Sequence, residues 1–265
     1  MGGVSGPALH PALAAAVEAA QAAGEIALRY YRGGFEVTIK PDQTPVTQAD
    51  REAEQAIRGV LGRAFPDWGF LGEEFGEAGS GDTRWIIDPI DGTKNFIRGI
   101  PFWAVLIGLE ERGEITTGVV FNPVTGDLLT ARAGEGAFAN GERIRVSDCA
   151  RMKDATLLHS GLNLLREDGC WDGFVRLVDA TGRSRGFGDY YGYNMVAQGK
   201  AELYVEVDLK PWDIAPVKIV VEEAGGRLTD FAGRPTIYDG PVLATNGRLH
   251  DEALALLGRA GSEEN

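Results

Sequence analysis

Carboxylates that could bind a metal ion come after apolar runs at three places in the sequence. Two follow WGFLG, two occur in DPID after WII, and one follows Pro-Trp; they are Glu73, Glu74, Asp88, Asp91 and Asp213. A buried carboxylate is costly unless it is paired or binds a metal. No run of Lys or Arg lies nearby in sequence to pair all five. Oxygen ligands of this kind suit Mg²⁺, with Mn²⁺ as an alternative.

The stretch DPIDGT has a spacing that suits metal and phosphate binding together. Asp88 and Asp91 flank Pro-Ile, so a turn would point both into one cavity and leave a backbone carbonyl between them free to coordinate. Gly92 and Thr93 then open a short helical segment, TKNFIRG, whose N-terminal N–H groups are a natural phosphate site. Metal ions beside phosphate-binding amides indicate phosphoryl chemistry with metal-activated water.

Each motif taken alone has a simpler interpretation. D-x-x-D-G turns are common on surfaces, Asp213 can be the N-cap of the helix that follows it, and Glu74 faces solvent by default. The metal interpretation is preferred because the three motifs occur together. The histidines, His10, His159 and His250, lie outside all of them, which disfavours a phosphohistidine route. We expect them at the surface or in packing.

Composition and charge are those of an ordinary globular protein. Of 265 residues, 44% are hydrophobic and 25% charged, and the formal net charge is -13. That acidic excess argues against nucleic-acid binding, and the apolar runs are too short for a membrane span. Cys149 and Cys170 are expected to be unpaired thiols, and MGGVSGPALHP lacks a signal-peptide pattern. We therefore expect a cytoplasmic protein without nucleic-acid or membrane partners.

The elements that must position the carboxylates form two halves, 8–146 and 147–261, of a single catalytic domain, 8–261. The hydrophobic periodicity, with Gly and Pro as signals for the ends of elements, predicts helices over 10–32, 47–65, 170–182, 189–200, 211–226 and 247–260. The same signals predict strands over 35–40, 84–90, 154–161, 201–207 and 240–246, an antiparallel meander over 102–146 and a loop over 40–47. Strict βαβ alternation is missing, so a layered α and β architecture is expected and not a plain Rossmann sheet.

Three motifs together resemble the inositol monophosphatase family, within the wider group of lithium-sensitive, Mg-dependent phosphomonoesterases. They are LGEEFG, WIIDPIDGTKNF and PWDIAPVKIVVEEAGG, in the family's order, and the resemblance runs from about Ala8 to Ala260. It implies an α/β fold, an αβαβα sandwich of the inositol monophosphatase and fructose-1,6-bisphosphatase type. It also implies a homodimer that hydrolyses a small-molecule phosphate ester with two or three Mg²⁺ ions.

The resemblance also implies the metal ligands. Glu73, Asp88 and the carbonyl of Ile90 resemble the ligands of one metal. Asp88, Asp91 and Asp213 resemble those of a second. Two members of this set, Asp91 and Asp213, are also expected to contact the substrate. The implied mechanism is direct displacement by water, without a covalent phosphoenzyme.

Further residues carry over from the family's motifs. Thr93 and Asp50 resemble the pair that orients the attacking water, and with Glu73 they form the expected catalytic set. The amides of Gly92 and Thr93 would hold the phosphate. Glu206 lies where the family often places a contact to a substrate hydroxyl.

The choice of ester rests on two further stretches, which resemble the histidinol-phosphate phosphatase branch. They are DGTKNFIRGIPFWA and RSRGFGDYYGY. Histidinol phosphate carries an amine and an imidazole. Asp189 and Glu206 could neutralise the cation, and Tyr190 or Tyr191 could stack on the ring. The alternative for the tyrosines is packing, and Lys94 could be a solvated side chain near the cavity mouth.

Other functions stay open at this point. The ester could be inositol 1-phosphate, fructose 1,6-bisphosphate or a nucleotide bisphosphate. A non-catalytic regulatory protein could also keep the fold. The intact set of acidic residues and Thr93 weighs against this last possibility, because a degenerate relative would be expected to lose a ligand.

Overall fold

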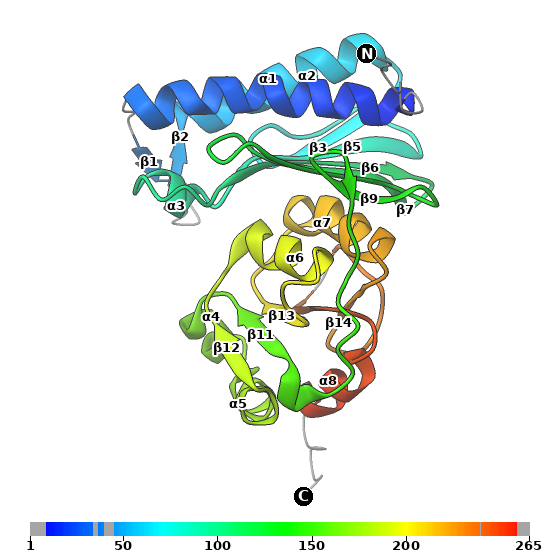
Figure 1. Ribbon diagram of the computed structural model, residues 1–265. Coiled ribbons are helices and arrows are strands. Elements are labelled where there is room, and N and C mark those ends of the chain that lie inside the picture. Colours follow the sequence, from blue (N-terminus) through cyan, green and yellow to red (C-terminus); the bar gives the residue numbers. More distant parts are fainter. Residues whose placement is uncertain (1–8, 34–36, 40–44, 239, 259–265) are drawn as a thin grey trace, which may run out of the picture.

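Helices and sheets alternate in five layers (Figure 1) in the computed structural model. It describes residues 9–33, 37–39, 45–238 and 240–258. The first layer holds α1 (Pro11–Gly33) and α2 (Gln48–Ala64), which lie over the first sheet. This arrangement confirms the predicted αβαβα sandwich.

The first sheet has eight strands in the order β10-β9-β8-β7-β6-β5-β3-β4. They are β3 (Gly69–Gly72), β4 (Gly76–Ala78), β5 (Thr83–Asp91), β6 (Ala104–Glu111), β7 (Glu114–Asn122), β8 (Asp127–Arg132), β9 (Gly136–Ala139) and β10 (Glu142–Arg143). Neighbours from β5 to β10 pair antiparallel, which confirms the predicted meander, whereas β3 and β5 pair parallel.

The second sheet has five strands in the order β12-β11-β13-β15-β14. They are β11 (Thr156–His159), β12 (Arg183–Arg185), β13 (Leu203–Glu206), β14 (Arg227–Asp230) and β15 (Val242–Thr245). Strand β11 runs parallel to both β12 and β13, while β13 and β14 each pair antiparallel with β15. The carboxyl ends of β11 and β13 therefore point to the same edge of this sheet.

Two helices fill the layer between the sheets, α6 (Asp189–Ala197) and α7 (Pro211–Glu223). Helix α7 approaches β6 and β7 closely because Gly108 and Gly118, which face each other across these strands, carry no side chain. A Cβ at Gly118 would lie 2.5 Å from the carbonyl oxygen of Pro216. This close packing holds the start of α7 over the first sheet.

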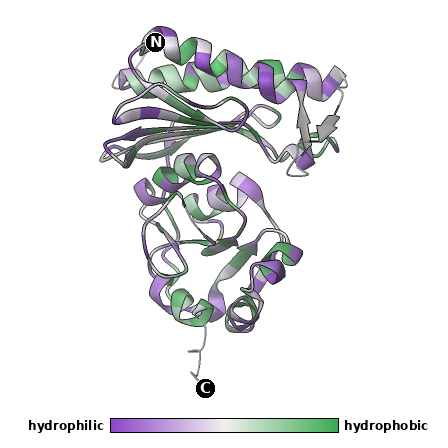
Figure 2. Cartoon of the chain, turned by 180° about the vertical axis from the view of Figure 1, so that it is seen from behind, coloured by the Kyte–Doolittle hydropathy of each residue, from purple (hydrophilic) through white to green (hydrophobic). Residues whose placement is uncertain are grey.

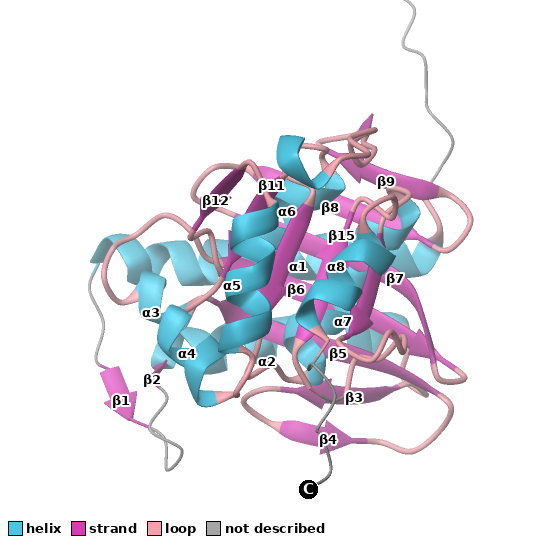
Figure 3. Cartoon of the chain, turned by 90° about the horizontal axis from the view of Figure 1, so that it is seen from below, coloured by secondary structure: helices cyan, strands magenta, loops and turns pink. Residues whose placement is uncertain are grey.

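The last layer contains α5 (Trp171–Ala180) and α8 (His250–Leu257), which lie in front of the second sheet in Figure 3. Shorter helices are α3 (Thr93–Phe96), α4 (Leu162–Glu167) and a 3₁₀ turn, Met152–Asp154. The outer helices carry both hydrophilic and hydrophobic residues (Figure 2), as expected of helices with one buried face. No helix in the described ranges is long and apolar enough to cross a membrane.

The structure corrects some of the predicted elements. Part of the predicted loop over 40–47 is a strand, β2 (Pro45–Thr47), because it pairs antiparallel with β1 (Val37–Ile39). The rest of that loop, residues 40–44, and the start of the strand predicted over 35–40 lie outside the described residues. Strands β4, β12 and β14 and helix α4 were not predicted, since each is short and lacks a clear apolar period.

Candidate active site

A cavity of about 730 Å³ opens between the two halves of the chain and is lined by residues of both. The first half contributes the end of β5, the start of α3 and the turn after β3. The second half contributes the ends of β11 and β13 and the starts of α6 and α7. The acidic motifs that are far apart in sequence therefore meet in one place.

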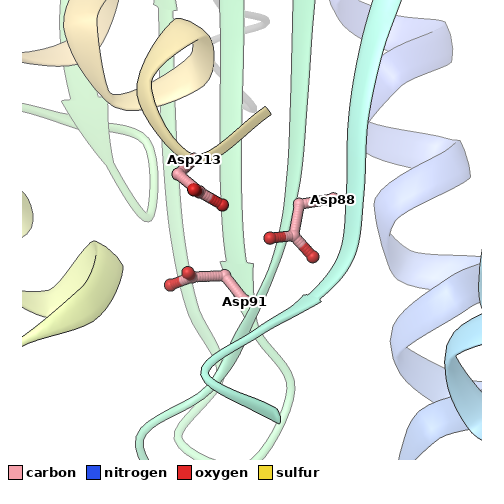
Figure 4. Close-up of side chains that lie close together, drawn as sticks. All are labelled: Asp88, Asp91 and Asp213. Atoms are coloured by element: carbon pink, nitrogen blue, oxygen red, sulfur yellow. The ribbon is translucent and has the colours of Figure 1, made fainter. Parts of the chain in front are cut away.

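Three carboxylates lie close together in this cavity (Figure 4). Asp88, Asp91 and Asp213 each offer an oxygen within 4.8 Å of the others. The motif predicted as a turn after the strand is an irregularity inside β5: its pairing with β6 shifts register between Asp88 and Asp91. In a regular strand, residues three apart face opposite sides of the sheet, so this irregularity is what places both carboxylates on one side.

Asp213 reaches the cavity from the first turn of α7. The structure places Lys210 at the N-cap, so the alternative of Asp213 as N-cap is wrong by three positions. Asp213 still caps the helix, because one of its carboxylate oxygens accepts the Lys210 N–H at 2.7 Å. Pro211 starts the helix, where its missing N–H costs nothing. Helix capping and a role in the acidic cluster are thus combined in one side chain.

Backbone amides orient the other two aspartates. One oxygen of Asp88 accepts the Ile90 N–H at 2.9 Å, and one oxygen of Asp91 accepts the Tyr190 N–H at 2.7 Å. The second bond joins β5 to α6, and so ties the first half of the chain to the second. Each carboxylate keeps another oxygen for a ligand, so the cluster is held in place before any ligand binds.

The cluster is electrostatically strained without a cation. Burial, and then the charge of Glu73, raises the pKa of Asp88 well above its usual value. Burial, and then the charge of Asp189, does the same for the pKa of Asp91, and burial raises the pKa of Asp213 to about 7. None of the ion pairs in the described ranges includes Asp88, Asp91 or Asp213. An all-oxygen set without a positive partner fits a divalent cation.

The metal-free protein is expected to lose stability as the pH rises from about 6.5 to about 8.5. The folded state holds protons on Asp213, with a pKa of about 7, and on Glu206, with a pKa of about 8, whereas the unfolded chain has already lost them. The folded state therefore binds more protons, and its stability falls with pH. Burial lowers the pKa of His250 to about 4. His250 therefore makes stability rise with pH, but only below about pH 6.5, the pKa of an unfolded histidine.

The measurement is the midpoint of thermal unfolding in EDTA across this pH range. We expect a fall of at least about 2–4 °C, the shift that roughly 1 kcal/mol produces in a chain of this size. Excess Mg²⁺ should flatten the slope, because a bound cation favours the ionised carboxylates. A midpoint in EDTA that stays constant or rises would contradict the assignment of these protons.

The remaining residues predicted for water and phosphate lie at or beside the cavity. Glu73, Ile90, Gly92 and Thr93 line it, and the Thr93 hydroxyl donates to the Ile90 carbonyl at 3.1 Å. Asp50 does not line it, but it is buried on α2, and its charge is among the causes that raise the pKa of Asp88. The structure brings the whole predicted set into one region.

Gly92 is required by its surroundings. Its φ of 84° lies in the left-handed region, which favours glycine. A Cβ there would lie 3.0 Å from the Phe102 carbonyl oxygen and 3.3 Å from a carboxylate oxygen of Asp189. The turn that carries the predicted phosphate contacts therefore packs directly against the predicted substrate contacts.

The predicted substrate residues divide into two groups. Asp189 and Glu206 line the cavity, and the Asp189 N–H donates to Glu206 at 3.2 Å. The Tyr190 ring instead packs in the core, and its hydroxyl accepts a hydrogen bond from Asn122 at 2.6 Å. Tyr190 also lines the cavity, and its backbone N–H donates to Asp91. Tyr191 is half-buried at the cavity wall and packs on Phe102, with ring centroids 4.8 Å apart.

The motifs did not single out two residues that line the cavity. The first is Asn95, whose side chain donates a hydrogen bond to Asp189 at 2.8 Å. Its position directly after DGTK in the sequence could have indicated that it belongs to the site. His159 ends β11, and a polar residue at the carboxyl end of a strand is a typical site position. Its Nδ1–H donates to the Ser160 carbonyl at 2.9 Å, which leaves Nε2 as the acceptor in the neutral form of the ring. His250, by contrast, is buried in packing, as predicted.

Comparisons with known proteins agree with this geometry. The profile of the Inositol monophosphatase family matches residues 8–262. A histidinol-phosphatase of Streptomyces coelicolor is 45% identical over 232 residues, 84% of this chain and 87% of that protein. A histidinol-phosphatase of Chlorobaculum parvum is 42% identical over 253 residues, which are 94% of this chain and 98% of that protein. The crystal structure of the extragenic suppressor protein suhB of Bartonella henselae superposes with a TM-score of 0.89 at 34% identity, covering 95% of this chain and 100% of that one. The chain therefore belongs to the inositol monophosphatase family.

Proposed function

We propose that this protein is a Mg²⁺-dependent phosphomonoesterase that hydrolyses histidinol phosphate. In the reaction, the oxygen of a water molecule bonds to phosphorus and the ester P–O bond breaks. The leaving oxygen takes up a proton, and histidinol and inorganic phosphate are released. The observation that carries the proposal is a second acidic pair, Asp189 and Glu206, in the same cavity as the three aspartates.

The phosphate end of the cavity is built from β5 and α3. Bound Mg²⁺ supplies positive charge for the phosphate oxygens and lowers the pKa of a water molecule. The Thr93 hydroxyl, which already donates to the Ile90 carbonyl, keeps its lone pairs to accept a hydrogen bond from that water and so orient it. Asp50 is the proposed second group that orients the water, and the amides of Gly92 and Thr93 are the proposed donors to the phosphate.

The second acidic pair suits a substrate that carries a positive charge. Burial and the charge of Asp189 raise the pKa of Glu206 to about 8, so this carboxyl lacks a cation in the free protein. Burial raises the pKa of Asp189, although Lys94 and Asn95 act against that shift. An ammonium group bound between them would favour both ionised forms. Inositol 1-phosphate and fructose 1,6-bisphosphate carry no cationic group that could do so.

Backbone strain supports a functional role for Asp189. It has a φ of 55°, in the left-handed region, and it opens α6 beside the cavity. Strained residues of this kind persist where the surroundings hold them, often at ligand sites. Here Asn95 holds one carboxylate oxygen, and itself is held by the Phe102 carbonyl at 2.9 Å.

Asp189→Asn tests the proposed contact with the amine. A charge-assisted hydrogen bond contributes about 1.5–3 kcal/mol, so kcat/KM for histidinol phosphate should fall by roughly one to two powers of ten. Hydrolysis of an aryl phosphate should hardly change, because that ester has no amine. Asn tolerates the left-handed backbone, so the turn should persist.

Asp208→Asn is the matched control. Asp208 also lines the cavity and has a similar φ of 61°, but it is exposed. This variant loses the same charge at the cavity and should retain the wild-type preference. If Asp189→Asn slows both esters equally, Asp189 is structural and the substrate proposal loses its main support.

A further inference from the structure

The turn that carries Glu73 is held from outside by side chains of helix α2. It joins β3 to β4, and the Glu73 N–H donates to the Ile87 carbonyl at 3.2 Å, directly before Asp88 in β5. Glu73 and Asp88 both line the cavity. Any shift of this turn would move Glu73 relative to the aspartate cluster.

Glu54 holds the turn from inside. Its side chain is fully buried, and one carboxylate oxygen accepts the Glu74 N–H at 2.7 Å. A Cβ at Gly72 would lie 2.0 Å from the other oxygen of Glu54. The backbone at Gly72 can therefore approach this carboxylate only because it has no side chain. Glu54 thus fixes the residues on both sides of Glu73.

Arg58, one helical turn further along α2, holds the far end of the same turn. Its guanidinium donates to Glu54 at 2.7 Å and to the Gly76 carbonyl at 2.6 Å. It also lies over the rings of Phe70 and Phe75, 5.1 and 5.7 Å from their centroids. The pair is therefore a fixed bridge from α2 to the turn.

Glu74 belongs to this arrangement as well. The prediction that Glu74 faces solvent is wrong, because only 3% of its side chain is exposed. Its carboxylate lies 4.0 Å from Arg51, which is also on α2. The turn after β3 is therefore packed against α2 on both sides of Glu73, and Asp50 at the start of the same helix is fixed relative to it.

We propose that Glu54 and Arg58 position Glu73 for the divalent cation and so set the metal affinity of the site. This inference rests on the proposed function, in which Glu73 is a metal ligand. Residues that orient a ligand from outside the coordination sphere commonly change metal affinity by about 10–100-fold when they are replaced. Glu54 and Arg58 do not line the cavity, so they act through the turn and not on the substrate.

The test measures metal binding directly, without turnover. Metal-free wild type, Glu54→Gln, Arg58→Met and Glu73→Gln are titrated with Mn²⁺ followed by electron paramagnetic resonance, and with Mg²⁺ by calorimetry. Arg58→Met keeps the apolar stem on Phe70 and removes both hydrogen bonds. We expect Glu54→Gln and Arg58→Met to weaken binding by about 10–100-fold, and Arg58→Lys to restore part of it. At saturating Mg²⁺, kcat should fall much less than the affinity.

A second buried ion pair provides the matched control. Arg84 donates to Glu110 at 2.6 Å, and their side chains are 24% and 7% exposed, against 17% and 0% for Arg58 and Glu54. Neither Arg84 nor Glu110 lines the cavity. Glu110→Gln and Arg84→Met should lower the unfolding midpoint and leave the metal affinity unchanged.

The outcomes separate the inference from the function on which it rests. Wild-type affinity in Glu54→Gln and Arg58→Met, with weak binding in Glu73→Gln, overturns the inference alone. An equal loss in the Glu110 and Arg84 variants overturns it too, because the effect would be one of general stability. Wild-type affinity in Glu73→Gln overturns the assigned ligand itself. If Glu54→Gln does not fold, Arg58→Met decides the question.

Discussion

Asp91→Asn is expected to abolish turnover while the fold is retained. The change keeps the shape of the side chain and its acceptor for the Tyr190 N–H, but it removes one negative charge from the cluster. Charge stabilisation by a correctly held metal contributes several kcal/mol to the transition state, so kcat should fall by at least about a thousandfold. Steady-state kinetics at saturating Mg²⁺ measure this loss.

The stability of this variant should move in the opposite direction. Burial and the charges of Asp189 and Asp213 raise the pKa of Asp91, so its ionised form destabilises the metal-free protein. The unfolding midpoint of Asp91→Asn in EDTA should therefore equal or exceed that of the wild type. Wild-type turnover in this variant would remove the metal cluster from the mechanism.

Asp230→Asn is a control with the opposite profile. Although burial raises the pKa of Asp230, hydrogen bonds from Arg234 and Ala232 lower it overall, so the ionised form stabilises the fold. This variant should melt at a lower temperature and keep the wild-type kcat. The two buried aspartates thus separate a residue held for chemistry from one held for structure.

Removal of divalent metal is expected to abolish hydrolysis of every phosphate ester. Three aspartates, Asp88, Asp91 and Asp213, meet in the cavity. No Lys or Arg in the described ranges forms an ion pair with them. An anionic phosphate would therefore be repelled unless a metal ion added positive charge. In excess EDTA, kcat/KM should fall by at least about a thousandfold, and Mg²⁺ should restore it.

Two controls accompany this measurement. Circular dichroism in EDTA should show the folded protein, because the layers pack on one another through apolar cores. The resemblance to lithium-sensitive phosphatases also implies that Li⁺ inhibits the Mg²⁺-restored enzyme by competing at a metal position. Activity that persists in excess EDTA contradicts the proposed mechanism as a whole.

The acidic site was predictable because its signals are local. DPID, GEE and PWD each place a carboxylate after an apolar run, and the free-energy cost of burying several carboxylates is itself a reason to expect a metal. The sequence did not show how Asp88 and Asp91 come to face the same way. That depends on an irregular pairing of β5 with β6, a long-range feature.

Other features could not be predicted because their partners are distant in sequence. Glu54 and Arg58 have the spacing of an ordinary exposed helix pair, and only the packing of α2 on the turn after β3 makes them a bridge. For Tyr190 the sequence left stacking on the substrate and packing open; its ring is buried, and its N–H donates to Asp91 across 99 residues of sequence. Strands β12 and β14 are defined by pairing with neighbours and not by their own residues.

The most direct test is a comparison of kcat/KM for histidinol phosphate and inositol 1-phosphate on the wild-type protein at saturating Mg²⁺. Fructose 1,6-bisphosphate and a nucleotide bisphosphate complete the panel. The second acidic pair should favour the amine-bearing ester by roughly one to two powers of ten. A preference for inositol 1-phosphate, or equal rates for all four esters, would contradict the role of Asp189 and Glu206 and with it the proposed substrate.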